Sequence, residues 1–247
     1  MLIMANRIMN IMDARSIADL RTLSYVNFGD HNITPDEVRH ILELCDAAWT
    51  HSGDPKHPHA ALRSGQCSTG FFDVLRALRF TNICRLFAHQ LVRKANRFMA
   101  EHDLPQPDWV VGSDHAGAAL SHSVAEFFGC EHDFTRKDPE NPKRQIWERF
   151  QIGPTQNVLN VEELVTTTGT LKAVRAGIRE GNPTDVMFMP FALTAVHRSD
   201  EASVEDHPII FLAHFDVKTC DPGDCELCKG GSKRLSPKTH WLELTKP

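Results

Sequence analysis

The sequence predicts an α/β fold in which a mostly parallel, twisted sheet is flanked by helices. From about Thr81 onward, short apolar runs alternate with segments that have apolar residues at helical spacing. This alternation is typical of βαβ units, whose strands are buried on both faces. The apolar fraction of 41% in 247 residues is enough to bury a core. We expect an N-terminal helical hood over residues 1–60, a core over residues 61–217 and a cysteine-containing tail over residues 218–247.

The hood is predicted from a helix start. Thr34, Pro35 and Glu37 form a capping-box pattern with proline at the first helical position. The apolar residues that follow at helical spacing are Val38, Ile41, Leu42, Cys45 and Trp49. The loop-rich segment HSGDPKHPHAALRSGQ then marks a boundary.

Within the core, three helices and six strands are expected. A stripe from Ile83 to Phe98 predicts the first helix, and Gly129 and Gly181 are expected to end the helices AALSHSVAEFFG and GTLKAVRAGIRE. The predicted strands are DWVVGSD, CEHDFT, NVLNV, DVMFM, ALTAVHR and PIIFLAHF.

Composition excludes several classes of protein. A net charge of −5 and a pI near 6.3 give no basic surface for nucleic acid. No apolar run approaches the ~20 residues needed to cross a membrane. Asn6, Arg7, Asn10 and Asp13 interrupt the methionine-rich start, which is therefore not expected to be a signal peptide. Seven cysteines, an odd number, suit a reducing compartment, and we expect a cytoplasmic protein.

The most informative segment is VLNVEELVTTTGT. In parallel sheets, ligands bind outside the carboxyl ends of the strands. A loop between a strand and a helix start offers unpaired N–H groups and a positive dipole end to a phosphate, and threonine hydroxyls add donors. Glu162 and Glu163 are placed to accept hydrogen bonds from ribose hydroxyls next to that phosphate. The predicted phosphate loop contains Thr166, Thr167, Thr168, Gly169 and Thr170. The alternatives are a solvated strand end and a threonine-rich helix cap without a ligand.

This segment resembles the phosphoribosyl pyrophosphate (PRPP) signature of the type I phosphoribosyltransferases. That signature is an apolar strand, two acids, two apolar residues and a Thr/Gly-rich phosphate loop. Thr168 departs from it, because the family usually has glycine there. A β-branched residue restricts the backbone and brings a side chain near the phosphate.

Within that family, the sequence from Leu62 to Phe215 resembles orotate phosphoribosyltransferases most. By this resemblance, Arg63, Ser64 and Gly65 in LRSGQCSTGFFD approach the base. Phe71 and Phe72 flank its ring; ordinary core packing is the alternative for these two residues.

The same resemblance assigns residues to pyrophosphate. The predicted pyrophosphate loop contains Gly112, Ser113, Asp114, His115 and Ala116. The family often has a lysine in this loop, whereas this chain has Ala116. Arg136 and Lys137 in FTRKDPENPKRQ correspond to the entry of a mobile catalytic loop, and with Glu162 and Glu163 they are the predicted catalytic residues. Beyond Lys137 the Lys and His catalytic segment of the family is not recognisable, and the nearby cations are Lys143, Arg144 and Arg149.

The tail CDPGDCELCKGGSKRLSPKTHW holds three cysteines. Cys220, Cys225 and Cys228 could bind Zn²⁺ with His240 or His214 as the fourth ligand, since zinc sites use Cys-x2-Cys pairs. Some relatives of orotate phosphoribosyltransferases end in a comparable Cys-x2-Cys-x2-Gly segment. Free, partly buried thiols are the alternative.

The resemblance implies a Mg²⁺-dependent phosphoribosyltransferase. Such an enzyme transfers ribose 5-phosphate from PRPP to a planar base, orotate or a related heterocycle, and releases pyrophosphate, in pyrimidine biosynthesis or nucleotide salvage. The family also implies a homodimer. Two alternatives remain: a PRPP-binding regulatory protein without catalysis, and a metal-binding interaction module that rests on the tail alone.

Overall fold

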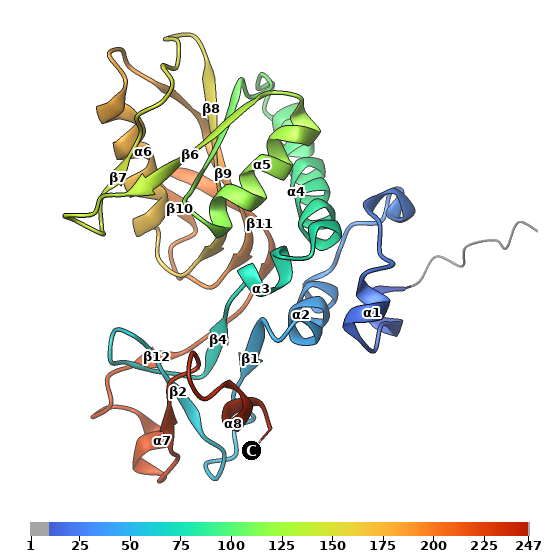
Figure 1. The fold of residues 1–247 in the computed structure, drawn as a ribbon, viewed down its shortest axis with the longest axis vertical. Coiled ribbons are helices and arrows are strands. Elements are labelled where there is room, and N and C mark those ends of the chain that lie inside the picture. The colour runs from blue at the N-terminus through green and yellow to red at the C-terminus, as the bar shows by residue number, and fades with distance from the viewer. Residues whose placement is uncertain (1–9, 247) are drawn as a thin grey trace, which may run out of the picture.

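The computed structural model describes residues 10–246, which form a large α/β lobe, a helical hood and a smaller lobe (Figure 1). The large lobe contains a seven-stranded sheet of order β10-β11-β9-β8-β5-β6-β7. The five inner strands are parallel, and both edge strands are antiparallel to their neighbours. The strands are β5 (Trp109–Ser113), β6 (Glu131–Lys137), β7 (Gln145–Ile146), β8 (Asn157–Val165), β9 (Met187–His197), β10 (Ser203–Val204) and β11 (His207–His214). The predicted fold class is confirmed.

Helices cover both faces of this sheet. On one face lie α4 (Thr81–Glu101) and α5 (Ala116–Phe128), and on the other lies α6 (Gly169–Gly181) (Figure 1). Alternate residues of β5 face the two layers: Val110 packs in the α4/α5 core, whereas Val111 packs with Val174 and Ile178 of α6. Gly129 ends α5 in the left-handed conformation at φ 69°, as expected for this helix stop.

Two strands are longer than predicted. β8 continues through the acid pair to Val165, and DVMFM and ALTAVHR form one continuous strand, β9. Pro190 interrupts the ladder between these two segments without ending the strand, and the register shifts beside it at Val158/Asn160. The carboxyl ends of the parallel strands point toward the smaller lobe (Figure 1).

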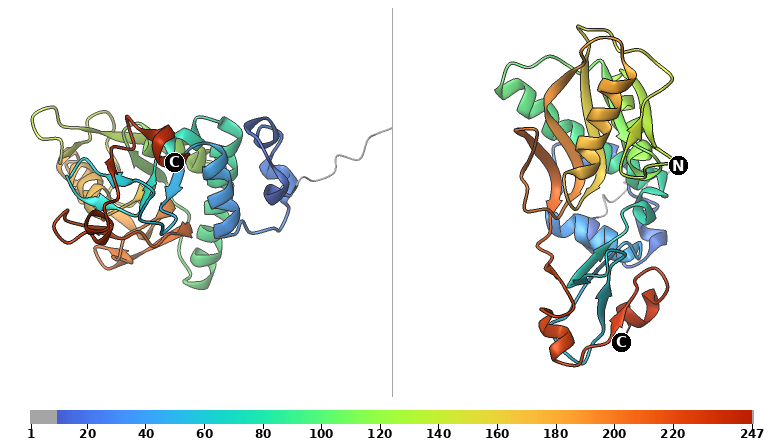
Figure 2. Two further views of the ribbon diagram at one scale, coloured as in Figure 1. Left: turned by 90° about the horizontal axis from the view of Figure 1, so that it is seen from below. Right: turned by 90° about the vertical axis from the view of Figure 1, so that its left-hand side faces the viewer.

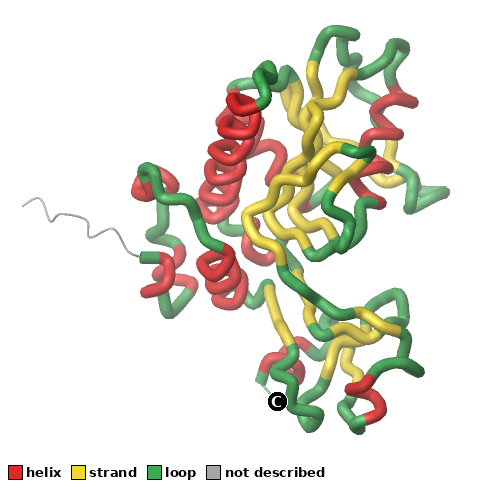
Figure 3. Tube along the Cα trace, turned by 180° about the vertical axis from the view of Figure 1, so that it is seen from behind, coloured by secondary structure: helices red, strands yellow, loops and turns green. Residues whose placement is uncertain are grey.

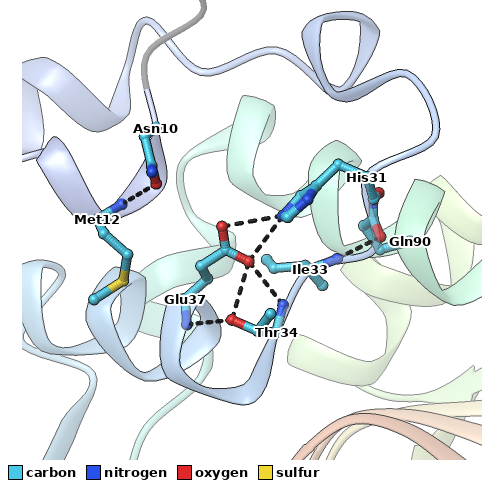
Figure 4. Close-up of polar contacts among 7 residues, drawn as sticks. All are labelled: Asn10, Met12, His31, Ile33, Thr34, Glu37 and Gln90. Carbon is cyan, nitrogen blue, oxygen red and sulfur yellow. Dashed lines mark hydrogen bonds and ion pairs between the residues drawn. The ribbon is translucent and has the colours of Figure 1, made fainter.

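The hood contains η1 (Ile11–Asp13), α1 (Ile17–Leu20), η2 (Tyr25–Phe28) and α2 (Pro35–Leu44). The predicted capping box is confirmed: Thr34 Oγ1 accepts from the Glu37 N–H, and the Glu37 carboxylate accepts from the Thr34 N–H (Figure 4). The Gln90 side chain of α4 bonds Ile33 N–H and His31 C=O, which fixes the hood to the large lobe. Most of the methionine-rich start, including Asn6 and Arg7, lies outside the described residues.

The helix α2 ends earlier than predicted. The chain turns at Asp46, whose φ is 53°, and Trp49 lies in a strand rather than on the helix. This strand, β1 (Ala48–Thr50), pairs with β4 (Gly70–Phe72) and leads into the smaller lobe, and α3 (Leu75–Leu78) connects β4 to α4.

The smaller lobe combines two segments that are distant in sequence (Figure 2), and its short strands lie apart from the large sheet (Figure 3). The hairpin of β2 (His59–Ala61) and β3 (Cys67–Ser68) receives β12 (Thr219–Cys220) on one side and β13 (Arg234–Leu235) on the other. Two short helices, α7 (Glu226–Lys229) and α8 (Trp241–Thr245), complete the tail. The predicted boundary near residue 60 therefore falls inside β2. Among residues 10–246, no helix has the length and apolarity that a membrane span requires.

Candidate active site

The predicted acid pair lies at the carboxyl end of β8, beside the end of β5. Glu162 is only 2% exposed. Its Oε1 accepts from the Ser113 N–H at 2.9 Å, and its Oε2 lies 2.7 Å from Ser113 Oγ. A Cβ at Gly117 would come within 2.8 Å of Glu162 Oε2, so the glycine at the start of α5 leaves room for this carboxyl group.

Burial dominates the electrostatics of both acids. Desolvation and the neighbouring Glu163 raise the pKa of Glu162, although the hydrogen bonds from Ser113 oppose the shift. Desolvation also raises the pKa of Glu163, and its hydrogen bond with Glu162 opposes that shift. Two neighbouring carboxyl groups disfavour each other's ionised form, and burial adds to this effect at Glu162. A cation or a hydrogen-bond donor from a ligand would favour the ionised form.

Charged groups from three other segments surround the acid pair. Lys137 at the end of β6 and Asp73 after β4 both act on the charge of Glu163. Lys137 Nζ lies 3.7 Å from Asp114 Oδ1, an oxygen that is buried and accepts no hydrogen bond among the described residues. The sheet edge therefore brings together Glu162, Glu163, Ser113, Asp114 and Lys137 from the predicted set.

The predicted phosphate loop joins β8 to α6. Thr166, Thr167, Gly169 and Thr170 are exposed, and no side chain caps the start of the helix. The first N–H groups of a helix have no intrahelical partner, so these donors are available to an anion.

Thr168 departs from the family pattern, but its side chain is buried rather than exposed in the loop. Its side chain is 1% exposed, and its hydroxyl donates to Glu201, which also pairs with Lys172 at 3.2 Å. Its backbone has φ −76° and ψ 2°, a conformation that does not require glycine. The expected restriction of the backbone is therefore compatible with the loop, and the side chain turns toward Glu201.

The predicted pyrophosphate loop lies between β5 and α5. A Cβ at Gly112 would lie 2.5 Å from the Gly117 carbonyl oxygen, so the strand end and the helix start approach closely only because residue 112 is glycine. His115 is exposed and has φ 66° and ψ −100°, an unfavourable conformation for a residue with a side chain. Such strain is typical of binding loops. Ala116 is buried in the first turn of α5.

Several predicted residues lie away from this group. Arg136 forms two bonds with Glu148 at 2.5 and 2.9 Å on the surface, because neighbouring residues of β6 point to opposite faces. Phe72 stacks on Phe215 at 4.9 Å within the core, and Phe71 packs on Trp241. Phe72 thus follows the core-packing alternative, whereas Phe71 is half-buried at the apolar cluster of the smaller lobe. Arg63, Ser64 and Gly65 form the exposed turn between β2 and β3.

Arg198 is a candidate site residue that the sequence did not reveal. It follows the carboxyl end of β9, is half-buried, and donates to the Gly70 carbonyl of β4 at 3.3 Å. Desolvation lowers its pKa, and it forms no ion pair among residues 10–246. An unpaired guanidinium near the sheet edge can receive an anion. Its position as the last residue of the predicted strand ALTAVHR was the available signal.

The structure corrects the predicted metal ligands. Potential ligand atoms of His59, Cys67, Cys225 and Cys228 all lie within 4.8 Å of one another. Cys220 is outside this group, although β12 places it opposite Cys67. His240 instead bonds Thr239 at the start of α8, and the alternative His214 bonds His197 and Asp216. Spacing within the tail could not reveal His59 and Cys67, because they lie more than 150 residues earlier in the chain.

The sheet and its edge agree with the fold that the sequence predicts. A mostly parallel sheet covered on both faces carries an acid pair and a phosphate-type loop at its carboxyl edge, as expected from the resemblance to type I phosphoribosyltransferases. UMP synthase of Leishmania donovani superposes with a TM-score of 0.52 at 15% identity, over 72% of this chain and 36% of that chain.

Sequence relatives refine this class. The chain is 26% identical over 184 residues to orotate phosphoribosyltransferase of Caldanaerobacter subterraneus subsp. tengcongensis, which covers 74% of this chain and 90% of the relative. It is also 26% identical over 185 residues to orotate phosphoribosyltransferase of Thermotoga maritima, over 75% and 92% of the two chains. No family model matches. The predicted resemblance to orotate phosphoribosyltransferases is confirmed, and the predicted enzyme class is that of these relatives.

Proposed function

We propose that this protein is a phosphoribosyltransferase that joins ribose 5-phosphate from PRPP to a planar, acidic base such as orotate, with release of pyrophosphate. The observation that carries the proposal is the coincidence of the acid pair and the Thr/Gly loop at one edge of the sheet. The similarity to orotate phosphoribosyltransferases over about three quarters of the chain supports it.

Each segment of the edge has a role in this proposal. The N–H groups and hydroxyls of the loop at residues 166–170 bind the 5-phosphate, and Glu163 accepts hydrogen bonds from the ribose. Glu162 holds the Ser113 N–H and hydroxyl and so positions the pyrophosphate loop. Lys137 contributes positive charge where the pyrophosphate departs.

The oxygen ligands of the site suit Mg²⁺. Mg²⁺ prefers one or two carboxylates together with substrate phosphates, and the Asp114 oxygen, which accepts no hydrogen bond among the described residues, and the Glu163 carboxyl group are of this type. Bound Mg²⁺ supplies neutralising charge for the pyrophosphate. The chain's own residues hold the sugar, the phosphates and the base in position, which is a large part of the rate enhancement in such transfers.

Turnover tests this function. We expect pyrophosphate release from PRPP and Mg²⁺ with at least one base in a panel of orotate, other pyrimidines and purines. Glu163→Ala should lower PRPP affinity by about 10-fold or more, because a hydrogen bond to a charged group is worth about 1.5–3 kcal/mol. Glu131→Ala is the matched control, since Glu131 is exposed at the start of β6, at the opposite edge of the sheet.

Two outcomes would oppose the proposal. Equal PRPP affinity in the Glu163→Ala and wild-type proteins would remove the assigned ribose site. Tight PRPP binding without pyrophosphate release for any base would favour the regulatory alternative. That alternative has some structural support, because Arg136 and Arg144 are both paired with acids at the surface rather than with groups of the site.

A further inference from the structure

The smaller lobe is too small to be held together by its apolar core. Its sheet consists of strands of two or three residues, and its buried apolar cluster contains Trp49, Ala60, Leu235 and Leu244. Strands this short form too few interactions to fix their own register. Natural domains with so little core use disulfides or a structural metal ion instead.

The thiol groups of this lobe converge without forming a disulfide. Cys67 Sγ and Cys228 Sγ are 3.5 Å apart, whereas a disulfide bond is about 2.05 Å long. His59 Nε2 lies 3.4 Å from Cys228 Sγ and 3.7 Å from Cys225 Sγ. Ligands at usual Zn²⁺ distances in a tetrahedron are about 3.6–3.8 Å apart, so these spacings match one shared ion.

The hydrogen bonds of His59 orient one ring nitrogen toward the thiols. Ser232 Oγ lies 2.5 Å from the His57 carbonyl oxygen and must donate its single hydrogen there, because a carbonyl only accepts. Its oxygen is then left to accept from His59 Nδ1–H, at 2.8 Å. Nε2 is therefore the nitrogen with a free lone pair, and it points at Cys225 and Cys228. A histidine held in this way is the usual arrangement for a metal ligand.

We propose that His59 Nε2 and the sulfur atoms of Cys67, Cys225 and Cys228 bind one structural Zn²⁺ ion. Three soft sulfur ligands and one imidazole are the donors that zinc prefers. His59, Cys67 and Cys225 are buried, and Cys228 is half-buried. Four protein ligands leave no position for a substrate, so the site is structural. The ion joins the β2–β3 hairpin to α7, segments separated by more than 150 residues.

Metal analysis of the full-length wild-type protein tests this site. Protein purified without added metal should contain about one zinc per chain. After exchange, Co²⁺ should give the visible bands of tetrahedral cobalt and a sulfur-to-cobalt charge-transfer band. Removal of the ion with a chelator should lower the unfolding temperature. Protein without metal, or with a disulfide between Cys67 and Cys228, would overturn the proposal.

Variants identify the ligands. Cys225→Ser should lose zinc, whereas Cys220→Ser, the same change in the same tail, should retain it. Zinc retained by Cys225→Ser but lost from Cys220→Ser would reject the assigned ligand set. Ser232→Ala changes no ligand and should weaken zinc affinity about 10- to 100-fold in competition with a chelator, because it frees the His59 ring. Unchanged affinity in Ser232→Ala would contradict the role assigned to His59. These measurements do not depend on turnover, so they are independent of the proposed enzyme activity.

Discussion

At the scale of single residues, the buried acid pair gives the protein a distinctive pH dependence. The folded protein holds Glu162 with a pKa above the ordinary value of 4.5. The folded state therefore binds more protons than the unfolded state once the pH exceeds 4.5, so the contribution of Glu162 to stability is complete below that pH and is lost as the pH rises.

This argument predicts the behaviour of Glu162→Gln. In the wild-type protein, the free energy of unfolding should fall between about pH 5 and about pH 8, because the pKa of Glu162 is raised from 4.5 to about 8, and the variant should show a smaller fall because its amide does not ionise. Urea unfolding across this range measures both. A variant with the same pH slope as the wild type would show that Glu162 is not the group responsible.

Sequence could predict the chemistry of these residues but not their partners. Glu162, Glu163 and the loop at residues 166–170 are adjacent in the chain, so their spacing alone indicated a common site. Ser113 and Asp73 reach the acid pair from distant parts of the chain, and only the folded arrangement brings them there. Phe71 and Phe72 had both a packing and a binding interpretation, and Phe215, far along the chain, decides for Phe72.

At the scale of elements, Arg136 and Lys137 at the end of β6 lie in different environments, although both were predicted to contact pyrophosphate. Lys137 faces Asp114, whereas Arg136 is bound to Glu148 at the surface. We expect Lys137→Ala to lower the rate of pyrophosphate release by about 10-fold or more, because a cation at the departing charge stabilises the transition state. Arg136→Ala should retain most of the activity.

Steady-state rates of pyrophosphate release for the two variants check this prediction. Comparable losses in both would mean that Arg136 leaves Glu148 during turnover and that the two cations act together.

The helix ends that carry local signals were well predicted, namely the capping box at the start of α2 and Gly129 at the end of α5. The strands of the smaller lobe were not predicted, because two- and three-residue strands carry no periodicity.

At the scale of the whole molecule, the carboxyl edge of the large sheet faces the smaller lobe, and Arg198 reaches from one to the other. Its guanidinium donates to the Gly70 carbonyl and has no acidic partner among the described residues. The pairing of a tail with an early hairpin, which builds the smaller lobe, could not be predicted from local patterns because the two segments meet only in the folded chain.

This position predicts how the protein chooses its base. If Arg198 receives the negative charge of the base, Arg198→Met should raise the KM for orotate about 10- to 100-fold, the range expected from a lost charge-assisted hydrogen bond. The KM for PRPP should change little, because the phosphate loop and acid pair remain. Arg198→Lys should recover part of the loss, since it restores the charge but not the planar fork. Initial rates with orotate and uracil separate the possible roles: an equal loss for both bases would show that Arg198 holds the two lobes together rather than recognising an acidic base.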